Sequence, residues 1–411
     1  MCRHCAAPLS LQMVDLGASP PSNAFNVSQN TREKHYPLRV LVCMQCGLAQ
    51  TDITLFKLNH DELFTKDYPY YSSTSVEYVE HARRYVEKMT HALKLDHASL
   101  TVEVGSNDGY LLQFVKTPCY GIEPTATCEK SRVPIITYTS FFSEKMARWL
   151  AEKGRADLMI CNNVLAHVPD INDFARGFAA LMKPQGVATF EFPWLANLID
   201  KCQFDTIYHE HYSYLSLTAV ISIFKRAHLS VFGCEKLATH GGSLRVYVQH
   251  EGAGRKLDDS VVWTLAEEML LGQAKTYADF QHRADDIKND LLYFLLHAKR
   301  DLRSVAGFGA AAKANTLLNY AGIRSDLIPY IVDETVAKRG KFCPGSRIPV
   351  RGNFDGAPDY IIIFPWNFRD EIIAKLAPLR ERGSSLVFAI PQLEVIEAAH
   401  AIHDRHEAAH A

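Results

Sequence analysis

The sequence predicts an α/β protein in three parts, and three observations support this fold class. Two Cys-x-x-Cys pairs lie in a short, turn-rich stretch near the N-terminus. From about Leu100 onward short apolar strands alternate with helical stretches, and a second strand with a glycine turn opens at Ser304. Such alternation implies right-handed crossovers and a parallel sheet covered on both faces. We therefore expect an N-terminal cysteine module (1–68), a central Rossmann-like domain (69–285) and a smaller C-terminal Rossmann-like α/β domain (286–411).

The composition is that of an ordinary globular protein. Of the 411 residues, 47% are hydrophobic and 22% are charged, and the formal net charge is −2. This charge provides no basic field for nucleic acid and no acidic tail typical of disorder. No apolar run approaches the ~20 residues of a membrane span, and the N-terminus lacks the apolar region of an export signal. We expect a cytoplasmic monomer that binds neither nucleic acid nor membranes.

The two Cys-x-x-Cys pairs predict a zinc site. Two residues between thiolates let both sulfurs face one ion, and two such knuckles complete a tetrahedral site. With four ligands the site leaves no position for water, so we expect a structural Zn²⁺. Four free cysteines are the alternative, and a zinc ribbon that reads nucleic acid is disfavoured because the module has no basic stripe. The expected ligands are Cys2, Cys5, Cys43 and Cys46.

A glycine-containing loop follows the predicted strand Leu100–Val104 and reads Glu103-Val-Gly-Ser-Asn-Asp-Gly109. Its first residue can accept hydrogen bonds from an amino group, and its small residues let a ligand approach the backbone. The spacing is not the GxGxxG of dinucleotide sites, and Glu123 ends the next strand, where a carboxylate can accept both ribose hydroxyls. These features favour S-adenosylmethionine (SAM). The residues expected to bind it are Glu103, Gly105, Asn107, Gly109, Glu123, Asn162 and Asn163.

Residues 208–214 read Tyr-His-Glu-His-Tyr-Ser-Tyr. A strand would place His209 and His211 on one face, which suits a metal, whereas a turn brings Tyr208 beside His211. The HExxH spacing of zinc hydrolases is absent. A histidine with a carboxylate neighbour makes a reasonable general base. Together with the SAM loop, this run predicts an enzyme that transfers a methyl group and needs a base.

A second glycine turn, Gly307-x-Gly309 followed by Lys313, has two interpretations. It can seat a phosphate through backbone N–H groups and a helix N-terminus, or it is an ordinary strand–helix turn. The turn at His240 we interpret as a tight turn before a strand. His167 and the Tyr70-Tyr71 pair, taken singly, are more typical of packed features than of a site.

The chain resembles the sugar C-methyltransferases of deoxysugar biosynthesis, which act on nucleotide-linked 4-keto-6-deoxy sugars. The match extends nearly from end to end and includes several ordered motifs. They are the two Cys-x-x-Cys pairs, Pro20–Phe25, Tyr70–Ser73, Glu103–Gly109, Asn163–Val168, Tyr208–Tyr214, His240–Val246 and Gly307–Asn319. The resemblance implies a zinc module, a class I SAM methyltransferase domain and a C-terminal α/β domain, with the nucleotide-diphosphate 4-keto-6-deoxy sugar between the last two.

The resemblance also implies a mechanism. His211 would remove the proton at C3, next to the C4 ketone, with Glu210 orienting the imidazole and Tyr208 close to the sugar. The resulting carbon nucleophile attacks the SAM methyl group, so the protein's task is positioning, deprotonation and enolate stabilisation. The substrate-binding positions carried over are Tyr70, Tyr71, His167, His209, Gly309 and Lys313.

Three other functions remain as alternatives. One is a SAM-dependent N- or O-methyltransferase, but a carbon acid needs the stronger base arrangement that the Tyr/His/Glu run provides. Another is a nucleic-acid-binding zinc ribbon with a degenerate Rossmann domain, which the near-neutral charge disfavours. A third is a nicotinamide-dependent sugar oxidoreductase that uses the second glycine turn.

Overall fold

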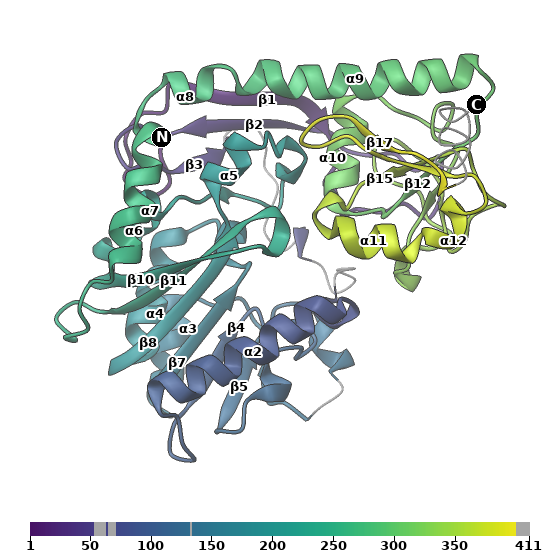
Figure 1. The fold of residues 1–411 in the computed structure, drawn as a ribbon. Helices are drawn as coiled ribbons and strands as arrows, with labels where there is room; N and C mark the ends of the chain where they lie inside the picture. The colour runs from purple at the N-terminus through teal and green to yellow at the C-terminus, as the bar shows by residue number, and fades with distance from the viewer. Residues whose placement is uncertain (53–62, 65–70, 132–133, 400–411) are drawn as a thin grey trace, which may run out of the picture.

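The computed structural model describes residues 1–52, 63–64, 71–131 and 134–399. Three sheets of four, seven and six strands organise this part of the chain (Figure 1). No helix among these residues has the length and apolarity that crossing a membrane would require.

The four-stranded sheet joins the cysteine module to the middle of the chain. Its order is β1-β2-β3-β9 and its pairs are antiparallel. The strands are β1 (Leu11–Ser19), β2 (Tyr36–Val42), β3 (Ala49–Thr51) and β9 (Ser213–Tyr214). Because β9 belongs to the Tyr/His/Glu run, the N-terminal sheet holds the chain directly after His211.

The seven-stranded sheet forms the central Rossmann-like unit. Its order is β10-β11-β8-β7-β4-β5-β6, and β11 runs antiparallel to both of its neighbours. Counted from β4, the order is 6-7-5-4-1-2-3, with the seventh strand reversed, which is the arrangement of class I SAM methyltransferases. The strands are β4 (Thr101–Val104), β5 (Cys119–Ile122), β6 (Thr137–Tyr138), β7 (Ala156–Asn162), β8 (Met182–Pro193), β10 (Leu229–Leu237) and β11 (Ser243–His250).

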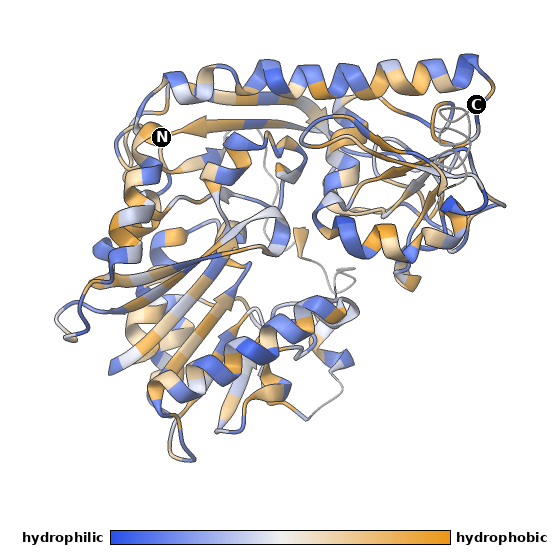
Figure 2. Ribbon diagram, viewed as in Figure 1, coloured by the Kyte–Doolittle hydropathy of each residue, from blue (hydrophilic) through white to orange (hydrophobic). Residues whose placement is uncertain are grey.

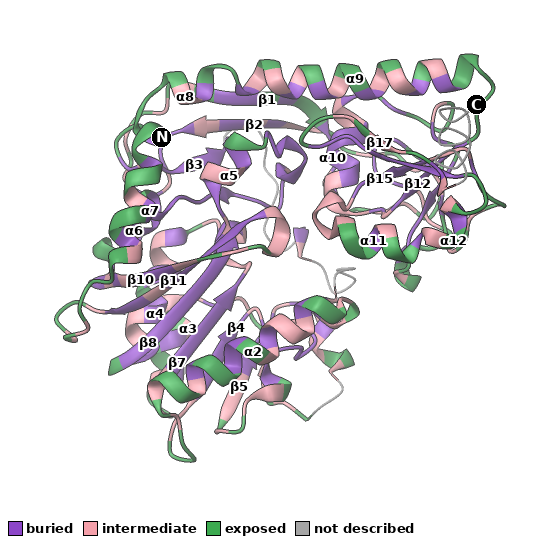
Figure 3. Cartoon of the chain, in the orientation of Figure 1, coloured by how far each residue is buried: buried purple, intermediate pink, exposed green. Residues whose placement is uncertain are grey.

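Helices cover both faces of the central sheet, so its inner strands β7 and β8 are buried along most of their length (Figure 3). On one face pack α3 (Glu144–Ala151), α4 (Ile171–Leu181) and α6 (Leu217–Arg226), and on the other packs α2 (Val76–Leu93). Asp170 caps α4 and Ser216 caps α6, each accepting a hydrogen bond from a backbone N–H of the first turn.

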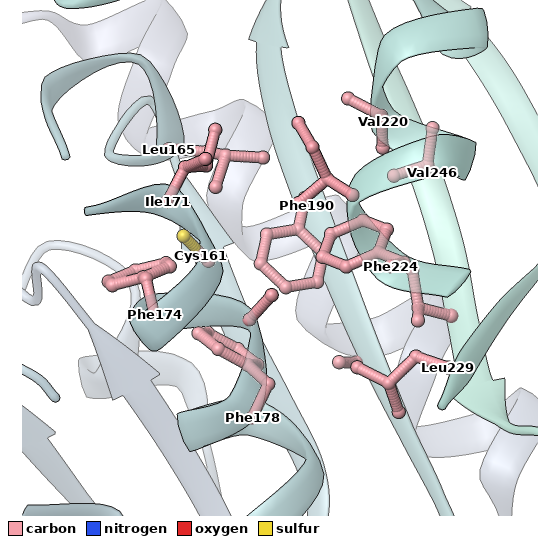
Figure 4. Packing of buried hydrophobic residues seen from close by; sticks show 14 of the residues in the cluster. Cys161, Leu165, Ile171, Phe174, Phe178, Phe190, Val220, Phe224, Leu229 and Val246 are labelled. Atoms are coloured by element: carbon pink, nitrogen blue, oxygen red, sulfur yellow. The ribbon is translucent and has the colours of Figure 1, made fainter. Parts of the chain in front are cut away.

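Aromatic rings fill the core between the sheet, α4 and α6 (Figure 4). The Phe190 ring from β8 lies 4.5 Å, centroid to centroid, from both Phe178 and Phe224. All three side chains are fully buried. Residues that alternate along a strand and recur every three or four positions along two helices thus meet in one layer.

The C-terminal sheet has the order β14-β13-β12-β15-β16-β17. It is parallel except for β17. Counted from β12, this is the 3-2-1-4-5-6 order of a Rossmann fold. The elements are β12 (Val305–Phe308), β13 (Ile331–Val332), β14 (Val350–Arg351), β15 (Tyr360–Ile363), β16 (Ser385–Phe388), β17 (Glu394–Ile396), α10 (Ala312–Tyr320), α11 (Arg369–Lys375) and α12 (Ala377–Arg380).

The long helix α9 (Phe280–Arg300) connects the N-terminal sheet with the C-terminal domain (Figure 1). Its buried residues recur every three or four positions, and in Figure 2 orange and blue residues alternate along it. They belong to one core cluster that also contains apolar residues of β1, β2 and α10. The first and last parts of the chain therefore share a core.

The sequence pattern also predicts a helix over 110–115, a strand over 327–332 and a helical stretch over 257–300, and the structure differs from the prediction at all three places. The helix expected over 110–115 is only the short 3₁₀ helix η3 (Leu112–Phe114), and the strand expected over 327–332 is limited to β13. The helical stretch at 257–300 is broken at Glu268–Gly272 before α9 begins. The other helices are α5 (Leu195–Asp200), α7 (Asp259–Glu267), α8 (Lys275–Ala278), η2 (Ser72–Thr74), η4 (Ala126–Lys130), η5 (Leu165–His167), η6 (Phe204–Thr206), η7 (Thr239–Gly241), η8 (Glu268–Gly272), η9 (Val336–Lys338) and η10 (Trp366–Phe368).

Candidate active site

The four cysteines of the two Cys-x-x-Cys pairs meet in space. Their sulfurs all lie within 4.8 Å of one another. The Sγ atoms of Cys2 and Cys46 are 3.6 Å apart, and those of Cys5 and Cys43 are 3.5 Å apart. Four sulfurs around one Zn²⁺, each at ~2.3 Å, lie about 3.8 Å apart, so this donor set fits the ion.

Glu103 lies at the end of β4 and is fully buried. Neither of its carboxylate oxygens has a hydrogen-bond partner within the described part of the chain. Burial, with the nearby negative charges of Glu123 and Asp108, raises its pKa well above the usual range. A buried carboxylate without a partner is costly, and a cationic amino group would relieve that cost. Glu103 therefore fits the amino group of SAM.

Glu123, at the end of the adjacent strand β5, is held differently. Its carboxylate accepts hydrogen bonds from the N–H and hydroxyl of Thr125, at 2.9 and 2.6 Å, and from the N–H of Asn107 at 3.0 Å. Asn107 has a φ of 49° and its side chain accepts a bond from the Ser72 N–H. The predicted cofactor loop is thus built from both strand ends and closed by the segment after Tyr71.

The glycines of the loop are required by close contacts. A Cβ at Gly105, whose φ is 75°, would lie 2.2 Å from Val164 Cγ2. One at Gly109, with a φ of 78°, would lie 2.7 Å from the Ser131 hydroxyl and from Ile135. Neither position tolerates a side chain without movement of the loop.

Asn162 and Asn163 follow β7 at the same edge of the sheet. Asn163 has a φ of 56° and donates through Nδ2 to the Tyr78 hydroxyl at 2.8 Å. The Oδ1 atoms of both asparagines are buried without a partner among the described residues. Unpartnered buried acceptors next to Glu103 are consistent with a ligand that carries several donors.

His211 is held by the carbonyl and hydroxyl on its two sides. Its Nδ1 lies 2.8 Å from the Thr206 carbonyl oxygen and its Nε2 lies 2.8 Å from the Tyr208 hydroxyl. A carbonyl can only accept, so Nδ1 carries the proton and Nε2 has the lone pair. Burial and the neighbouring His167 lower the pKa of His211 well below its usual value. The ring is therefore neutral, with its basic nitrogen next to Tyr208, as the turn interpretation predicts.

Glu210 does not orient the His211 ring, contrary to what the resemblance implies, because both ring nitrogens already have other partners. Its Oε1 accepts the N–H of Asn23 at 3.3 Å, and its Oε2 has no partner in the described ranges. Burial raises the pKa of Glu210 to about 7. The backbone carbonyl of Glu210 instead accepts from Nδ1 of His167 at 2.8 Å.

His167 and His211 form a pair, with ring centroids 4.7 Å apart. The other predicted substrate-binding residues of this region lie elsewhere. His209 bonds the Tyr36 carbonyl at 3.1 Å and packs on that ring in β2. Tyr71 accepts a hydrogen bond from Lys130 at 2.8 Å. Tyr70 lies outside the described residues.

Lys313, in the first turn of α10, is brought to the histidines from the C-terminal domain. Its Nζ donates to Asn367 Oδ1 at 2.6 Å and lies 4.2 Å from the centroid of Trp366. Burial lowers the pKa of Lys313 to about 8, while nearby Asp205 opposes this shift. The positive charge of Lys313 in turn contributes to the lowered pKa of His211.

The backbone N–H of Gly309, in the turn that can seat a phosphate or serve as an ordinary strand–helix turn, is already used within the C-terminal domain. Its N–H donates to the Val332 carbonyl at 2.8 Å. A Cβ at this position would lie 2.5 Å from Pro365, so packing accounts for the glycine. Any phosphate would have to be held by Lys313 and the first turn of α10.

Two residues near the histidines were missed in the sequence. His240, taken there as part of a turn, has a φ of 53°, and its Nε2 is buried without a partner among the residues described. Asp205 accepts the Trp366 indole N–H at 2.7 Å, and burial raises its pKa to about 6. Asp205 lies just before the Tyr/His/Glu run. In the sequence it is a single acidic residue between Phe and Thr, a pattern that does not indicate a functional site.

The comparisons with known proteins cover all three parts. Residues 2–64 match a family model of a zinc binding domain, 78–232 a methyltransferase domain and 238–391 a C-methyltransferase C-terminal domain. The chain is 31% identical to the C-methyltransferase NovU of Streptomyces niveus, over 97% of both chains.

Solved structures overlap with less of the chain. A SAM-dependent methyltransferase from Clostridium acetobutylicum is 9% identical, covers 42% of this chain and 92% of its own, and gives a TM-score of 0.35. Magnesium protoporphyrin IX methyltransferase from Synechocystis is 15% identical, with coverages of 42% and 84% and a TM-score of 0.31. The family matches and the full-length similarity to NovU decide the identity: the chain belongs to the C-methyltransferase family with an N-terminal zinc-binding domain, and it is a SAM-dependent C-methyltransferase.

Proposed function

We propose that the protein methylates C3 of a nucleotide-diphosphate 4-keto-6-deoxy sugar, with His211 as the base. The observation that supports this proposal is the fixed tautomer of His211. Its Nδ1 proton is committed to the Thr206 carbonyl, so its Nε2 is left as a proton acceptor inside a buried site. Carbon methylation requires such an acceptor because the carbon must first lose a proton.

In the proposed reaction His211 and Tyr208 each have one task. His211 Nε2 takes the proton, and the C–H electron pair becomes the enolate shared by C3 and the ketone oxygen. Tyr208, whose hydroxyl donates to Nε2 in the free protein, turns to the ketone oxygen when Nε2 is protonated. A donor fixed near the developing oxyanion stabilises the enolate.

Bound SAM supplies a methyl group on a sulfonium, which accepts the carbon nucleophile without further activation. The chain's part is to hold it: Glu103 fits the amino group, Glu123 the ribose hydroxyls, and Asn162 and Asn163 offer buried acceptors.

The nucleotide-linked sugar is supported by the resemblance of the motifs and by Lys313. A half-buried ammonium near His211, in the first turn of a helix, is suited to a diphosphate. Its counter-charge Asp205 has an Oδ1 without a partner within the described ranges. Lys313 Nζ donates to Asn367 rather than to Asp205, which leaves room for an anion on the lysine.

The experiment is an assay with SAM and a thymidine-diphosphate 4-keto-6-deoxy sugar in deuterated water, followed by mass spectrometry with fragmentation. We expect one added methyl group at C3, and we expect His211→Asn to abolish turnover while SAM binding stays intact. A methyl group on oxygen or nitrogen, or a fully active His211→Asn, would overturn the proposal. Deuterium at C3 without methylation would support the base and reject this particular sugar.

A further inference from the structure

Arg3 lies between the first two cysteines and reaches out of the cysteine module. It belongs to the Cys2–Cys5 knuckle, and its backbone N–H donates to Gln50 Oε1 at 3.0 Å. Its side chain crosses to two loops of the central domain. No carboxylate forms an ion pair with it among residues 1–52, 63–64, 71–131 and 134–399. The guanidinium instead faces backbone carbonyls, a hydroxyl and the Tyr212 ring, whose centroid lies 5.6 Å from Cζ.

The partners of the Arg3 side chain are the residues that directly follow His167 and His211. One amino group donates to the carbonyls of Val168 and Pro169, at 3.1 and 2.9 Å. These residues come immediately after His167. The other amino group donates to the Ser213 hydroxyl at 2.8 Å and to the Tyr212 carbonyl. Those residues come immediately after His211. A single planar fork thus spans both loops.

The cysteine module holds the His211 segment at a second point. Thr51, at the end of β3, donates its hydroxyl to the His211 carbonyl at 2.6 Å, and its N–H donates to the Tyr212 carbonyl at 3.1 Å. The pairing of β3 with β9 continues this contact. Within the described residues no strand of the module pairs with the loop that carries His167. Arg3 therefore adds a second link between the two loops, beside the hydrogen bond from His167 Nδ1 to the Glu210 carbonyl at 2.8 Å.

We propose that Arg3 is a positioning residue for the methyl transfer, because it holds together the two loops that carry His167 and His211 and so, with the direct bond from His167 to the Glu210 carbonyl, fixes the distance and tilt between the two rings. The rings lie 4.7 Å apart at 59°, and each is attached to a loop that the guanidinium clamps. Because Arg3 is anchored by Cys2 and Cys5, the cysteine centre fixes catalytic geometry as well as stability. This inference rests on the proposed role of His211.

Lysine cannot replace arginine fully here. An ammonium is a point charge with three donors, whereas the guanidinium presents a rigid fork that reaches four acceptors on two loops. Misplacement of a catalytic group by ~1 Å can cost about 100-fold in rate. We therefore expect Arg3→Gln to lower kcat about 100-fold and Arg3→Lys to restore part of it.

His4 provides a matched control from the same knuckle. It is buried and also contacts the central domain, through Asn172 at 2.7 Å and Ser222 at 3.0 Å. Ser222 lies in α6 and Asn172 in the first turn of α4, and neither is among the four acceptors of the Arg3 side chain. Loss of the His4 contacts weakens the docking of the module without releasing the clamp.

The experiment compares Arg3→Gln, Arg3→Lys, His4→Gln and His211→Asn as full-length proteins. For each we would measure zinc per chain, Tm, the Kd for SAM, and kcat and KM with the thymidine-diphosphate 4-keto-6-deoxy sugar. NMR spectra of the histidine rings, assigned with His167 and His211 variants, report the pair without turnover. We expect the Arg3 variants to keep zinc and SAM affinity, to lose kcat with little change in KM, and to shift both ring signals. His4→Gln should lower Tm with kcat and ring signals unchanged.

Unchanged kcat and ring signals in a folded, zinc-loaded Arg3→Gln or Arg3→Lys would overturn the inference. So would an equal loss of kcat in His4→Gln, because the effect would then be one of stability. The ring signals separate this test from the proposed function. If His211→Asn stays active while Arg3→Gln still shifts the rings, the clamp exists and the base has been misassigned.

Discussion

Replacement of Glu103 by glutamine should separate cofactor binding from stability. The structure leaves both carboxylate oxygens of Glu103 without partners within the described residues, so the free protein loses no hydrogen bond in Glu103→Gln. Bound SAM, in contrast, loses a hydrogen bond from its amino group to a charged carboxylate. Such bonds contribute ~1.5–3 kcal/mol. At ~1.4 kcal/mol per tenfold, the Kd for SAM should rise about 10- to 140-fold.

The stabilisation of the protein by SAM should also depend on pH, in a direction that follows from the raised pKa of Glu103. The pKa of Glu103 is raised, so the folded free protein holds this proton above the pH at which the unfolded chain releases it. Its contribution to stability therefore falls as the pH rises from the ordinary glutamate range, ~4.3, to the folded pKa. Binding a cation removes that penalty. The rise in Tm caused by SAM should grow with pH in the wild type and stay flat in Glu103→Gln.

Glu123→Gln is the matched comparison, because Glu123 ends the neighbouring strand but accepts three hydrogen bonds from Thr125 and Asn107. Glu123→Gln should lower the free energy of unfolding of the free protein by about 1–3 kcal/mol, because one buried donor is left without its acceptor. Calorimetric titration with SAM and thermal unfolding of both variants measure the contrast. A Kd within threefold of the wild type in Glu103→Gln would refute the role of this carboxylate.

Three further predictions follow from the geometry. For the proposed substrate, kcat/KM should fall as the pH rises through about 8, where Lys313 loses its charge, and Lys313→Arg should abolish this fall; a flat wild-type profile from pH 6 to 10 would contradict it. Cys43→Ser should reduce bound zinc from about one per chain and lower Tm, since structural zinc contributes directly to folding; metal analysis that finds zinc-free, stable and active protein would exclude it. Phe190→Ala should cost ~3–5 kcal/mol in the free energy of unfolding because of the cavity it leaves, measured by denaturant titration, and a loss under 1 kcal/mol would contradict the packing.

Patterns that are local in sequence predicted local structure well. Each Cys-x-x-Cys pair forms a knuckle within four residues. The presence of both pairs in the sequence was therefore enough to predict that four sulfurs meet. Tyr208 and His211 meet because a turn brings residues three apart together, which their spacing indicates. The unpartnered Glu103 follows from its place at the end of a buried strand, before a glycine loop.

Contacts that depend on tertiary structure had no signal in the sequence. The Thr206 carbonyl orients His211, but a backbone acceptor is present at every residue and marks none. The carboxylate next in sequence, Glu210, was therefore the wrong choice for this role. Arg3 lies far along the chain from the two loops that it contacts. In the sequence nothing distinguishes it from the other lysines and arginines, of which the chain has 44 in total.

The position of His211 explains why this chemistry uses three domains. The SAM loop is built from the ends of β4, β5 and β7, all within the central sheet. The segment that carries the proposed base, His211, is held from outside that sheet: Thr51 of the N-terminal sheet donates to the His211 carbonyl, and Thr316 of α10 donates to the Ile207 carbonyl at 2.9 Å. α10 in turn bonds the N-terminal module, since Asn315 donates to the Ser22 carbonyl at 2.7 Å. A methyltransferase domain alone can hold the methyl donor, but a carbon acid also needs a fixed base, and here the flanking domains fix it.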